Sequence, residues 1–304
     1  MSDVGREPQG VQEPPLPPIP PPPGRAVRLP GRGTTWIRDA AGPPGAPTIF
    51  LLHGWTATAD LNWLPTYGPL SRHFRVVAMD HRGHGRGIHS RRPFRLSDCA
   101  DDVAAVADAI GIDRFIVVGY SMGGPIAQLT WKRHRDRVNG MVLCATSRRF
   151  AGSDLRQRAM FGGLFGLSMA TRLAPPRVRR NLVANVMSRR PEQIPLSPWA
   201  LDELSRHDPA ELLQAGYAIG GFDSRDWIGE VNVPTAVVIT RQDMVVAPRY
   251  QLALANSIPR ATVHLVDGNH AVCVERPSRF VPVLIDACRT VSQRVRREAS
   301  TVRG

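Results

Sequence analysis

Ser121 stands in a setting that suits a nucleophile. The segment 119–123, Gly-Tyr-Ser-Met-Gly, matches G-x-S-x-G; it follows the apolar run 115–120 and leads into a helical pattern over 122–134. In this strand–turn–helix context, a sharp bend holds the serine in a strained conformation, and only small neighbours let the strand and the helix come so close. The bend presents the hydroxyl above a helix N-terminus, whose dipole favours developing negative charge. The pattern therefore predicts that Ser121 is a nucleophile.

The elements that would position this serine alternate along the chain. Short apolar runs predict strands at 34–38, 48–53, 75–80, 115–120, 141–145, 235–240 and 262–266. Helical patterns occupy 98–110, 122–134, 247–257 and 274–293. Most of the apolar runs are too continuous for half-exposed antiparallel strands. The order predicts an α/β protein with a doubly wound, mostly parallel sheet.

Two further segments match a known family in the same order along the chain. His53-Gly54-Trp55 ends an apolar strand, and the run Asp-His-Arg-Gly-His-Gly at 80–85 follows the next one. With the serine turn, these segments resemble the α/β-hydrolase superfamily, where they form the oxyanion loop and a D-x-R-G-x-G turn. The resemblance covers about residues 25 to 292 and points to a serine esterase or lipase-like member. It implies the α/β-hydrolase fold, with a helical cap at 148–212 inserted after the sixth strand.

The resemblance also implies a catalytic triad in the chain order serine, aspartate, histidine. Asp243 follows the strand 235–240 at the family's acid position, and His270 follows the strand 262–266 in a segment similar to the family's G-x-H…E-x-P. Asn269 stands where glycine is more usual, a departure that does not touch the imidazole. The predicted sheet agrees, because both residues follow the carboxyl ends of parallel strands, where open α/β sheets gather ligand sites.

Other carboxylates fit the acid position less well. Asp223 and Asp226 precede the strand rather than follow it, and Asp267 is too close to His270 in sequence to approach it from a neighbouring strand. No carboxylate directly follows the strand 141–145, which disfavours the family's alternative arrangement. Asp243 is therefore the predicted acid.

Acyl-transfer chemistry assigns a role to each residue. His270 would take the Ser121 proton and return it to the leaving group, while Asp243 fixes the imidazole tautomer. The backbone N–H groups of Trp55 and Met122 would face the tetrahedral oxyanion. The side chain of Trp55 has two open roles, lining the acyl pocket or packing.

Histidines and cysteines elsewhere offer few alternatives. His81, His84 and His89 crowd one turn, but no carboxylate with ligand spacing accompanies them, and the resemblance assigns them to a structural turn. Asp80 is expected to stabilise that turn. The four cysteines lie far apart without a CxxC pair, which argues against a disulfide framework or a cysteine-rich zinc site. Cys273 is expected to pack, and we expect no metal and no cofactor.

A serine at position 121 narrows the set of reactions that the resemblance allows. Epoxide hydrolases and haloalkane dehalogenases of this superfamily place an aspartate there, so we interpret the chain as a carboxylic-ester hydrolase that acts on a small-molecule ester through an acyl-enzyme. Thioester, lactone and C–C bond hydrolysis and haloperoxidase-like perhydrolysis remain alternatives on the same triad. A non-catalytic binding member of the fold is the alternative from another class. Candidates for contact with an apolar acyl group are the cap residues Met160, Phe161, Leu164 and Phe165.

The remaining segments are proline-rich or basic. Residues 1–24 predict an extended leader, because nine prolines fall within 8–23, and each removes a backbone donor. The hydrolase core is expected at 25–147 and 213–292, and a basic tail at 293–304. The 304 residues carry a formal charge of +13, but no zinc-finger, RNP or helix-turn-helix pattern accompanies it, so we do not expect nucleic-acid binding.

The cap concentrates positive charge, since residues 148–190 hold ten arginines and one acid. With apolar neighbours at 160–169, this composition combines the apolar area and the positive charge that capture of an anionic membrane surface or substrate would use; a solvated, partly mobile lid is the more ordinary interpretation. The sequence has neither an apolar run of membrane-spanning length nor a secretory signal pattern. We expect a cytoplasmic protein that is able to lie at a membrane surface, and its oligomeric state is open.

Overall fold

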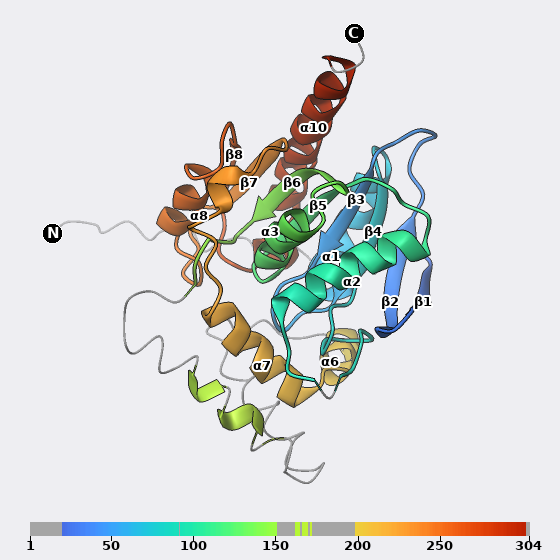
Figure 1. Cartoon of the computed structure of the whole chain (residues 1–304), viewed down its shortest axis with the longest axis vertical. Coiled ribbons are helices and arrows are strands. Elements are labelled where there is room, and N and C mark those ends of the chain that lie inside the picture. The colour runs from blue at the N-terminus through green and yellow to red at the C-terminus, as the bar shows by residue number, and fades with distance from the viewer. Residues whose placement is uncertain are drawn as a thin grey trace, which may run out of the picture.

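The described chain forms one eight-stranded sheet. The computed structural model describes residues 20–90, 92–150, 162–164, 166–169, 171 and 198–301. The strand order is β1-β2-β4-β3-β5-β6-β7-β8 (Figure 1). The strands are β1 (Gly24–Leu29), β2 (Gly33–Ala40), β3 (Thr48–Leu52), β4 (Arg75–Met79), β5 (Phe115–Tyr120), β6 (Val138–Cys144), β7 (Thr235–Thr240) and β8 (Thr262–Val266). The pairs β1–β2 and β2–β4 are antiparallel and the others parallel, which confirms the doubly wound, mostly parallel sheet.

Helices cover both faces of this sheet. The longer ones are α1 (Ala59–Ser71), α2 (Leu96–Ala109), α3 (Gly123–Arg133), α6 (Pro198–Ser205), α7 (Pro209–Gly220), α8 (Pro248–Ala255) and α10 (Pro277–Thr301). The short α9 (Val272–Glu275) and a 3₁₀ turn at Ile228–Glu230 complete the described set. Buried residues of α2, α3 and α8 share one apolar cluster, and those of α1 and α10 share the other.

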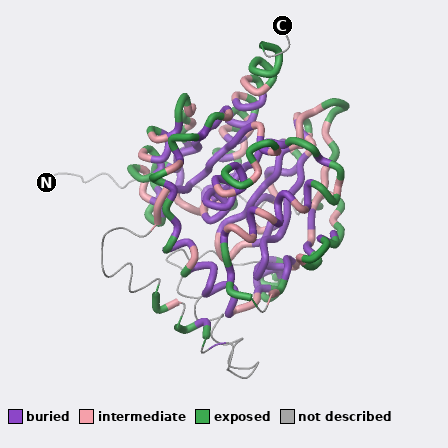
Figure 2. Tube along the Cα trace, in the orientation of Figure 1, coloured by how far each residue is buried: buried purple, intermediate pink, exposed green. Residues whose placement is uncertain are grey.

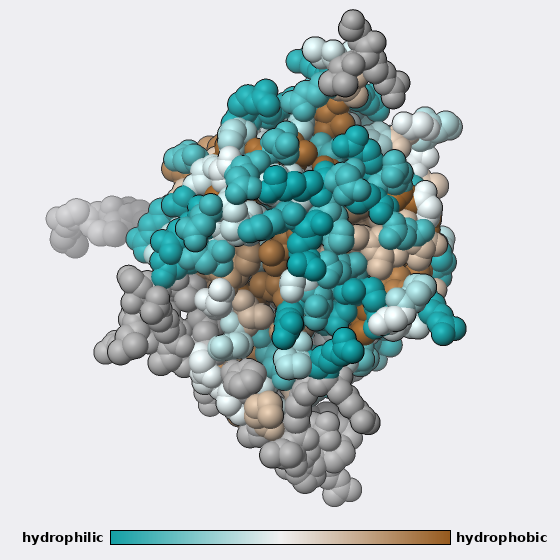
Figure 3. Space-filling model, in the orientation of Figure 1, coloured by the Kyte–Doolittle hydropathy of each residue, from teal (hydrophilic) through white to brown (hydrophobic). Residues whose placement is uncertain are grey.

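The strands separate these two clusters by simple alternation. In β3, Ile49 and Leu51 belong to the cluster of α1 and α10, whereas Phe50 and Leu52 belong to that of α2 and α3. Successive side chains of a strand point to opposite faces, so a strand that is apolar throughout is covered on both sides. Every residue of β5 is buried (Figure 2). Hydrophilic side chains cover most of the outer surface over α2 and α3 (Figure 3), as the doubly wound arrangement requires.

The cap insertion follows the sixth strand, as predicted. The strand β6 ends at Cys144 and β7 begins at Thr235, with α6 and α7 between them. These two helices lie together at one end of the molecule (Figure 1). The predicted boundary at 212 falls inside α7. Most of the arginine-rich part of the cap, with Met160, Phe161 and Phe165, lies outside the described residues.

The two ends of the described chain differ from the sequence analysis. β1 was not among the predicted strands, and it begins at Gly24, directly after the prolines of the leader. α10 runs to Thr301 and projects from the body (Figure 1), so the basic segment after 293 is helical over that length. Of the helices in the described ranges, none combines the length and apolar character that a bilayer crossing needs.

Candidate active site

Ser121 lies on the sharp turn between β5 and α3. Its φ is 51°, the left-handed region that non-glycine residues rarely adopt and that stores strain at functional sites. The glycines of the motif make this turn possible. A Cβ on Gly119 would collide with the carbonyl of Gly123, and a Cβ on Gly123 would collide with the carbonyl of Leu52. The turn is fixed further because Ser121 N donates to Cys144 O at 3.0 Å.

The structure brings the predicted serine, histidine and aspartate together. His270, in the loop between β8 and α9, places Nε2 2.9 Å from Ser121 Oγ. Its Nδ1 lies 2.7 Å from Oδ2 of Asp243, a residue in the loop after β7. The histidine loop is held from β5, because the Tyr120 hydroxyl donates to the His270 carbonyl at 2.8 Å. Three loops that follow three parallel strands thus form one hydrogen-bonded chain.

The carboxylate of Asp243 is completely enclosed by donors. Its Oδ1 accepts from the backbone N–H groups of Val245 and Val246, both at 2.8 Å. Its Oδ2 accepts from the hydroxyl of Thr240 at 2.7 Å and the amide of Gln251 at 3.2 Å, beside the contact with His270. The sequence analysis missed Thr240 and Gln251. No sequence signal marks Gln251, which lies on α8 and reaches the site only in the fold.

The other carboxylates considered for the acid role lie elsewhere. Asp267 pairs with Arg241 at 2.9 Å, and both side chains are more than half exposed. Asp223 pairs with Arg225 at 2.7 Å, and Asp226 is exposed. Asp243 is the one of these four that the structure places against His270.

The loop after β3 lies directly beside Ser121. A Cβ on Gly54 would be 3.4 Å from Ser121 Cβ. Gly54 N donates to Oδ1 of the buried Asn62 at 2.8 Å, and Asn62 Nδ2 contacts Cys273 Sγ at 3.6 Å. Asn62, which the sequence analysis also missed, therefore ties this loop to the segment that follows His270. Trp55 comes next to Gly54, as Met122 comes next to Ser121.

Cys273 is buried, as expected for a packing residue. Burial raises the pKa of its thiol to about 12. A thiol with that pKa is almost fully protonated near neutral pH, and the thiol is a far weaker nucleophile than the thiolate. Its contacts with Asn62 and the Tyr120 hydroxyl are those of a packed group.

Two histidines of the turn, His81 and His84, are buried and pack against His53 with tilted rings, whereas His89 is about half exposed and lies 3.6 Å from Glu211. His81 and His84 have ring centroids 4.4 and 5.3 Å from that of His53. Burial lowers the pKa of His81 to about 3 and that of His53 and His84 well below the usual value. His53 Nε2 accepts from His81 N at 2.9 Å. Within the residues that the structure describes, no three histidine, cysteine or acidic side chains are grouped to hold a metal ion.

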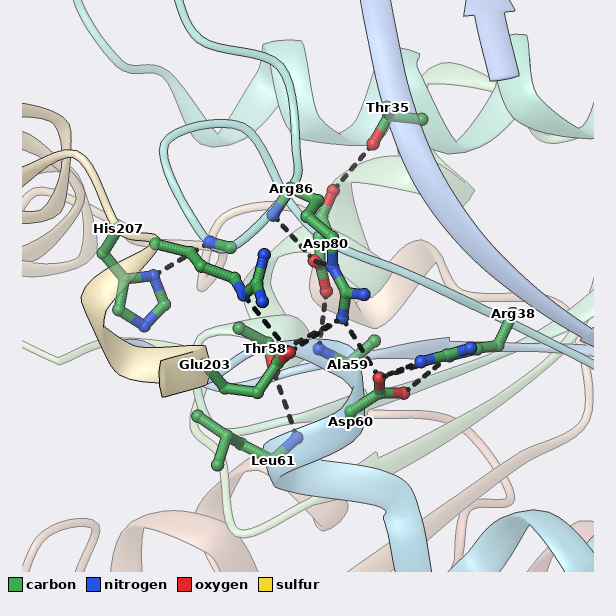
Figure 4. Close-up of polar contacts among 12 residues, drawn as sticks. Thr35, Arg38, Thr58, Ala59, Asp60, Leu61, Asp80, Arg86, Glu203 and His207 are labelled. Carbon is green, nitrogen blue, oxygen red and sulfur yellow. Dashed lines mark hydrogen bonds and ion pairs between the residues drawn. The ribbon is translucent and has the colours of Figure 1, made fainter. Parts of the chain in front are cut away.

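Asp80 stabilises its turn, as predicted, and stands in a larger polar network (Figure 4). Its two oxygens accept from Ala59 N at 2.8 Å and Arg86 N at 2.9 Å. The guanidinium of Arg86 contacts Asp60 at 3.1 Å and Glu203 of α6 at 3.0 Å. Glu203 also accepts from the Thr58 hydroxyl at 3.1 Å. The network therefore joins the cap helix α6 to the core.

The raised pKa of the Asp80 carboxyl predicts that this group contributes to folding stability in a pH-dependent way. Burial raises its pKa from 3.8 to about 6, although the two backbone N–H groups lower it. Because the folded state binds this proton more tightly than the unfolded state, the contribution is complete below about pH 4 and is lost as pH rises through 6. Wild-type protein should lose about 2 kcal/mol relative to Asp80→Asn between pH 4 and 7. Urea unfolding of both proteins across this range measures the difference. The exposed Asp226→Asn is the control, and parallel curves for Asp80→Asn and wild type would contradict the prediction.

The sequence matches a known protein family over most of its length. Residues 47–277 match the sequence family described as the alpha/beta hydrolase fold. RutD of Agrobacterium fabrum, named as a candidate carbamate hydrolase, is 28% identical over 249 residues, which are 77% of this chain and 90% of that protein. The 3-oxoadipate enol-lactonase 2 of Acinetobacter baylyi is 26% identical over 211 residues, 67% of this chain and 75% of that protein.

Solved structures share the fold. An esterase from Thermogutta terrifontis superposes with a TM-score of 0.69 at 22% identity, covering 88% of this chain and 99% of its own. A bromoperoxidase from Bacillus anthracis gives 0.72 at 17% identity, covering 88% and 100%. The family match spans most of the chain and the architecture agrees, so the chain belongs to the α/β-hydrolase fold family.

Proposed function

We propose that the protein is a serine hydrolase that cleaves carboxylic esters through Ser121, His270 and Asp243. The observation that carries the proposal is the chain of two hydrogen bonds, 2.9 Å from Ser121 to His270 and 2.7 Å from His270 to Asp243. With its proton on Nδ1, His270 donates to Asp243 and accepts from the serine hydroxyl. This tautomer is the one that a general base needs.

The reaction proceeds in two halves. Ser121 Oγ attacks the ester carbonyl carbon while His270 Nε2 takes the hydroxyl proton; the alcohol then leaves with that proton, and an acyl-enzyme remains. Water attacks the acyl carbon in the same manner, with His270 again as base, and the carboxylic acid product departs. Asp243 stabilises the imidazolium that forms in each half.

The developing oxyanion needs preorganised donors. We assign the backbone N–H groups of Met122 and Trp55 to this role, because one follows the nucleophile directly and the other follows Gly54, whose Cβ position is 3.4 Å from Ser121 Cβ. A donor of this type contributes about 3 kcal/mol to the transition state in comparable enzymes.

Lactone hydrolysis is the second candidate function. The enol-lactonase of Acinetobacter baylyi is 26% identical over 67% of this chain, and a lactone is an ester whose alcohol and acid belong to one molecule. Carbamates, named for RutD, likewise present an acyl carbon to the serine. The same triad serves all three substrates, so the substrate class depends on the pocket rather than on the chemistry.

A fluorophosphonate probe tests the proposed function. We expect stoichiometric covalent labelling of native protein, with the modified peptide containing Ser121, and no labelling after unfolding. A panel of p-nitrophenyl esters of increasing acyl length, beside γ-lactones and aryl carbamates, then ranks the substrates. Absence of both labelling and turnover in folded protein would favour the non-catalytic alternative.

The cap and the cellular location stay predictions. Most of residues 148–190 lies outside the described residues, and binding of this segment to an anionic membrane surface or an anionic substrate is proposed on its composition alone. The cytoplasmic location is likewise an expectation from the sequence. Leu164, the one described member of the four cap candidates, lies against α7.

A further inference from the structure

The side chain of Trp55 leaves the loop beside the nucleophile and reaches the cap. Its indole Nε1 donates to the carbonyl oxygen of Leu212 on α7 at 2.8 Å, across 157 residues of sequence. The ring is partly buried and packs against the core cluster of α2 and α3. The side chain of Trp55, the residue after Gly54, is therefore fixed by the cap helix α7.

The cap helix has a slot that fits this ring. Leu212 and Gly216 are one helical turn apart and lie on the same face of α7. A Cβ on Gly216 would stand 2.7 Å from Trp55 Cζ2 and 3.1 Å from Cη2. It would also stand 2.7 Å from Leu164 Cδ1. The missing side chain at 216 thus makes the space in which the indole lies.

The slot is held in place relative to the sheet. Asp208 caps α7, with its Oδ1 accepting from Ala210 N and Glu211 N at 2.9 Å. Glu211 Oε1 accepts from Ser90 N at 2.6 Å, and Gln214 Oε1 accepts from Phe94 N at 2.9 Å. These bonds join α7 to the segment after β4, so the position of the slot does not depend on Trp55 itself.

The loop is also fixed on the side of the nucleophile. Gly54 N donates to the buried Asn62 at 2.8 Å. The backbone at 54 and the side chain at 55 are therefore anchored to different parts of the molecule, and the peptide between them is the one whose N–H we assign to the oxyanion.

We propose that Trp55 is a positioning residue, and that the Leu212–Gly216 slot of α7 holds its indole so that the Trp55 N–H faces the oxyanion. This inference rests on the proposed function. Oxyanion donors act because they are in place before charge develops. A loosened loop loses transition-state stabilisation while ground-state binding of the substrate is little changed, which lowers kcat more than it raises KM.

The test uses two single variants and their combination. Trp55→Phe keeps an aromatic ring but removes the indole N–H and the Cζ2 and Cη2 atoms. Gly216→Ala leaves Trp55 intact but fills its slot. Each should lower kcat on a p-nitrophenyl ester about tenfold, with KM within about twofold of wild type. Phe lacks the two Trp55 atoms that meet the new Cβ, and the remaining contact is with Leu164 Cδ1, the end of a flexible side chain that can move away. Adding Gly216→Ala to Trp55→Phe should therefore cost little more.

Gly221→Ala is the matched control. It lies at the end of the same helix, where the nearest atoms to a new Cβ are backbone oxygens at 3.8 and 3.9 Å, and it should leave kcat unchanged. An arylboronic acid, which forms a tetrahedral adduct with a catalytic serine, supplies a second readout. Its affinity should fall about tenfold in both single variants, in parallel with kcat.

The outcomes separate the two proposals. If the wild type is active, and folded Trp55→Phe and Gly216→Ala both keep its kcat and its boronate affinity, the positioning role alone is overturned. Effects of the two substitutions that multiply fully in the double variant would also overturn it, because they would not act through one contact. A wild-type protein without esterase activity or fluorophosphonate labelling would overturn the proposed function and this inference together. Thermal unfolding of every variant verifies folding, and Gly216→Ala carries the test if Trp55→Phe does not fold.

Discussion

Ser121→Ala should lower ester turnover by a factor of about 10⁴ to 10⁶ and abolish fluorophosphonate labelling. The hydroxyl is the atom that His270 Nε2 contacts at 2.9 Å, and alanine leaves that imidazole without a nucleophile to activate. The residual rate would come from the oxyanion donors and from substrate binding, which remain. Initial rates on the best p-nitrophenyl ester, with enzyme concentrations raised to measure slow turnover, provide the number.

The fold should survive this substitution. The backbone bonds of the turn, from Ser121 N to Cys144 O and from the Thr146 hydroxyl to Ser121 O, do not involve the removed atom. Ser71→Ala is a suitable control, since its exposed hydroxyl bonds only locally, to Gly68 O at 2.9 Å. Undiminished turnover by pure, folded Ser121→Ala would contradict the serine-hydrolase proposal, provided that Ser71→Ala behaves as wild type.

The central parallel strands were predictable because burial on both faces favours apolar residues along the middle of each strand. β5 and β7 are buried throughout, and both appear in the sequence as uninterrupted apolar runs. β1 gives no such signal. It pairs on one side only, with β2, and only Val27 and Leu29 of its six residues are buried. A short, half-exposed edge strand that follows prolines resembles a loop in sequence.

The helix α1 was missed for a different reason. Pro65 and Pro69 lie inside it, and proline in a helical pattern predicts a break because it removes a backbone donor and crowds the preceding turn. The N-terminal signal was present, since the Thr58 hydroxyl accepts from Leu61 N at 3.1 Å as an N-cap. Burial of the Trp63 and Leu70 side chains against the rest of the protein stabilises the helix, although its two prolines disfavour it.

The three residues that we propose to react were predictable, whereas the residues that support them were not. Ser121, Asp243 and His270 each follow a strand, so the rule that parallel strands end at one edge brings them together. Asn62 and the slot at Gly216 act through contacts with segments far away in the sequence. Gln251 acts from the helix that follows Asp243, eight residues along the chain. Their residue types carry no chemistry that would single them out, and only the packed structure relates them to the site.

Asp243→Asn should lower turnover by a factor of about 10⁴ at neutral pH. The backbone N–H groups of Val245 and Val246 both donate to Oδ1, so the asparagine oxygen takes that position and the amide NH₂ takes the place of Oδ2. The NH₂ group then faces His270 Nδ1, which must become an acceptor. The imidazole proton moves to Nε2, and the nitrogen beside Ser121 can no longer accept a proton.

The wrong-tautomer mechanism predicts different effects of the same substitution at Asp243 and at Asp226. Asp226→Asn, which changes the same group at an exposed position, should leave turnover within about twofold of wild type, since it contacts none of the three residues. Kinetics of both variants on one ester, with thermal unfolding measured in parallel, give the ranking. The new NH₂ group faces Thr240 and Gln251, which both donate to Oδ2 in the wild type, so the unfolding measurement is needed to show that Asp243→Asn is folded. A large loss of turnover in folded Asp243→Asn then reports on the histidine. A larger loss in Asp226→Asn than in Asp243→Asn would show that the catalytic carboxylate lies before β7 and not after it.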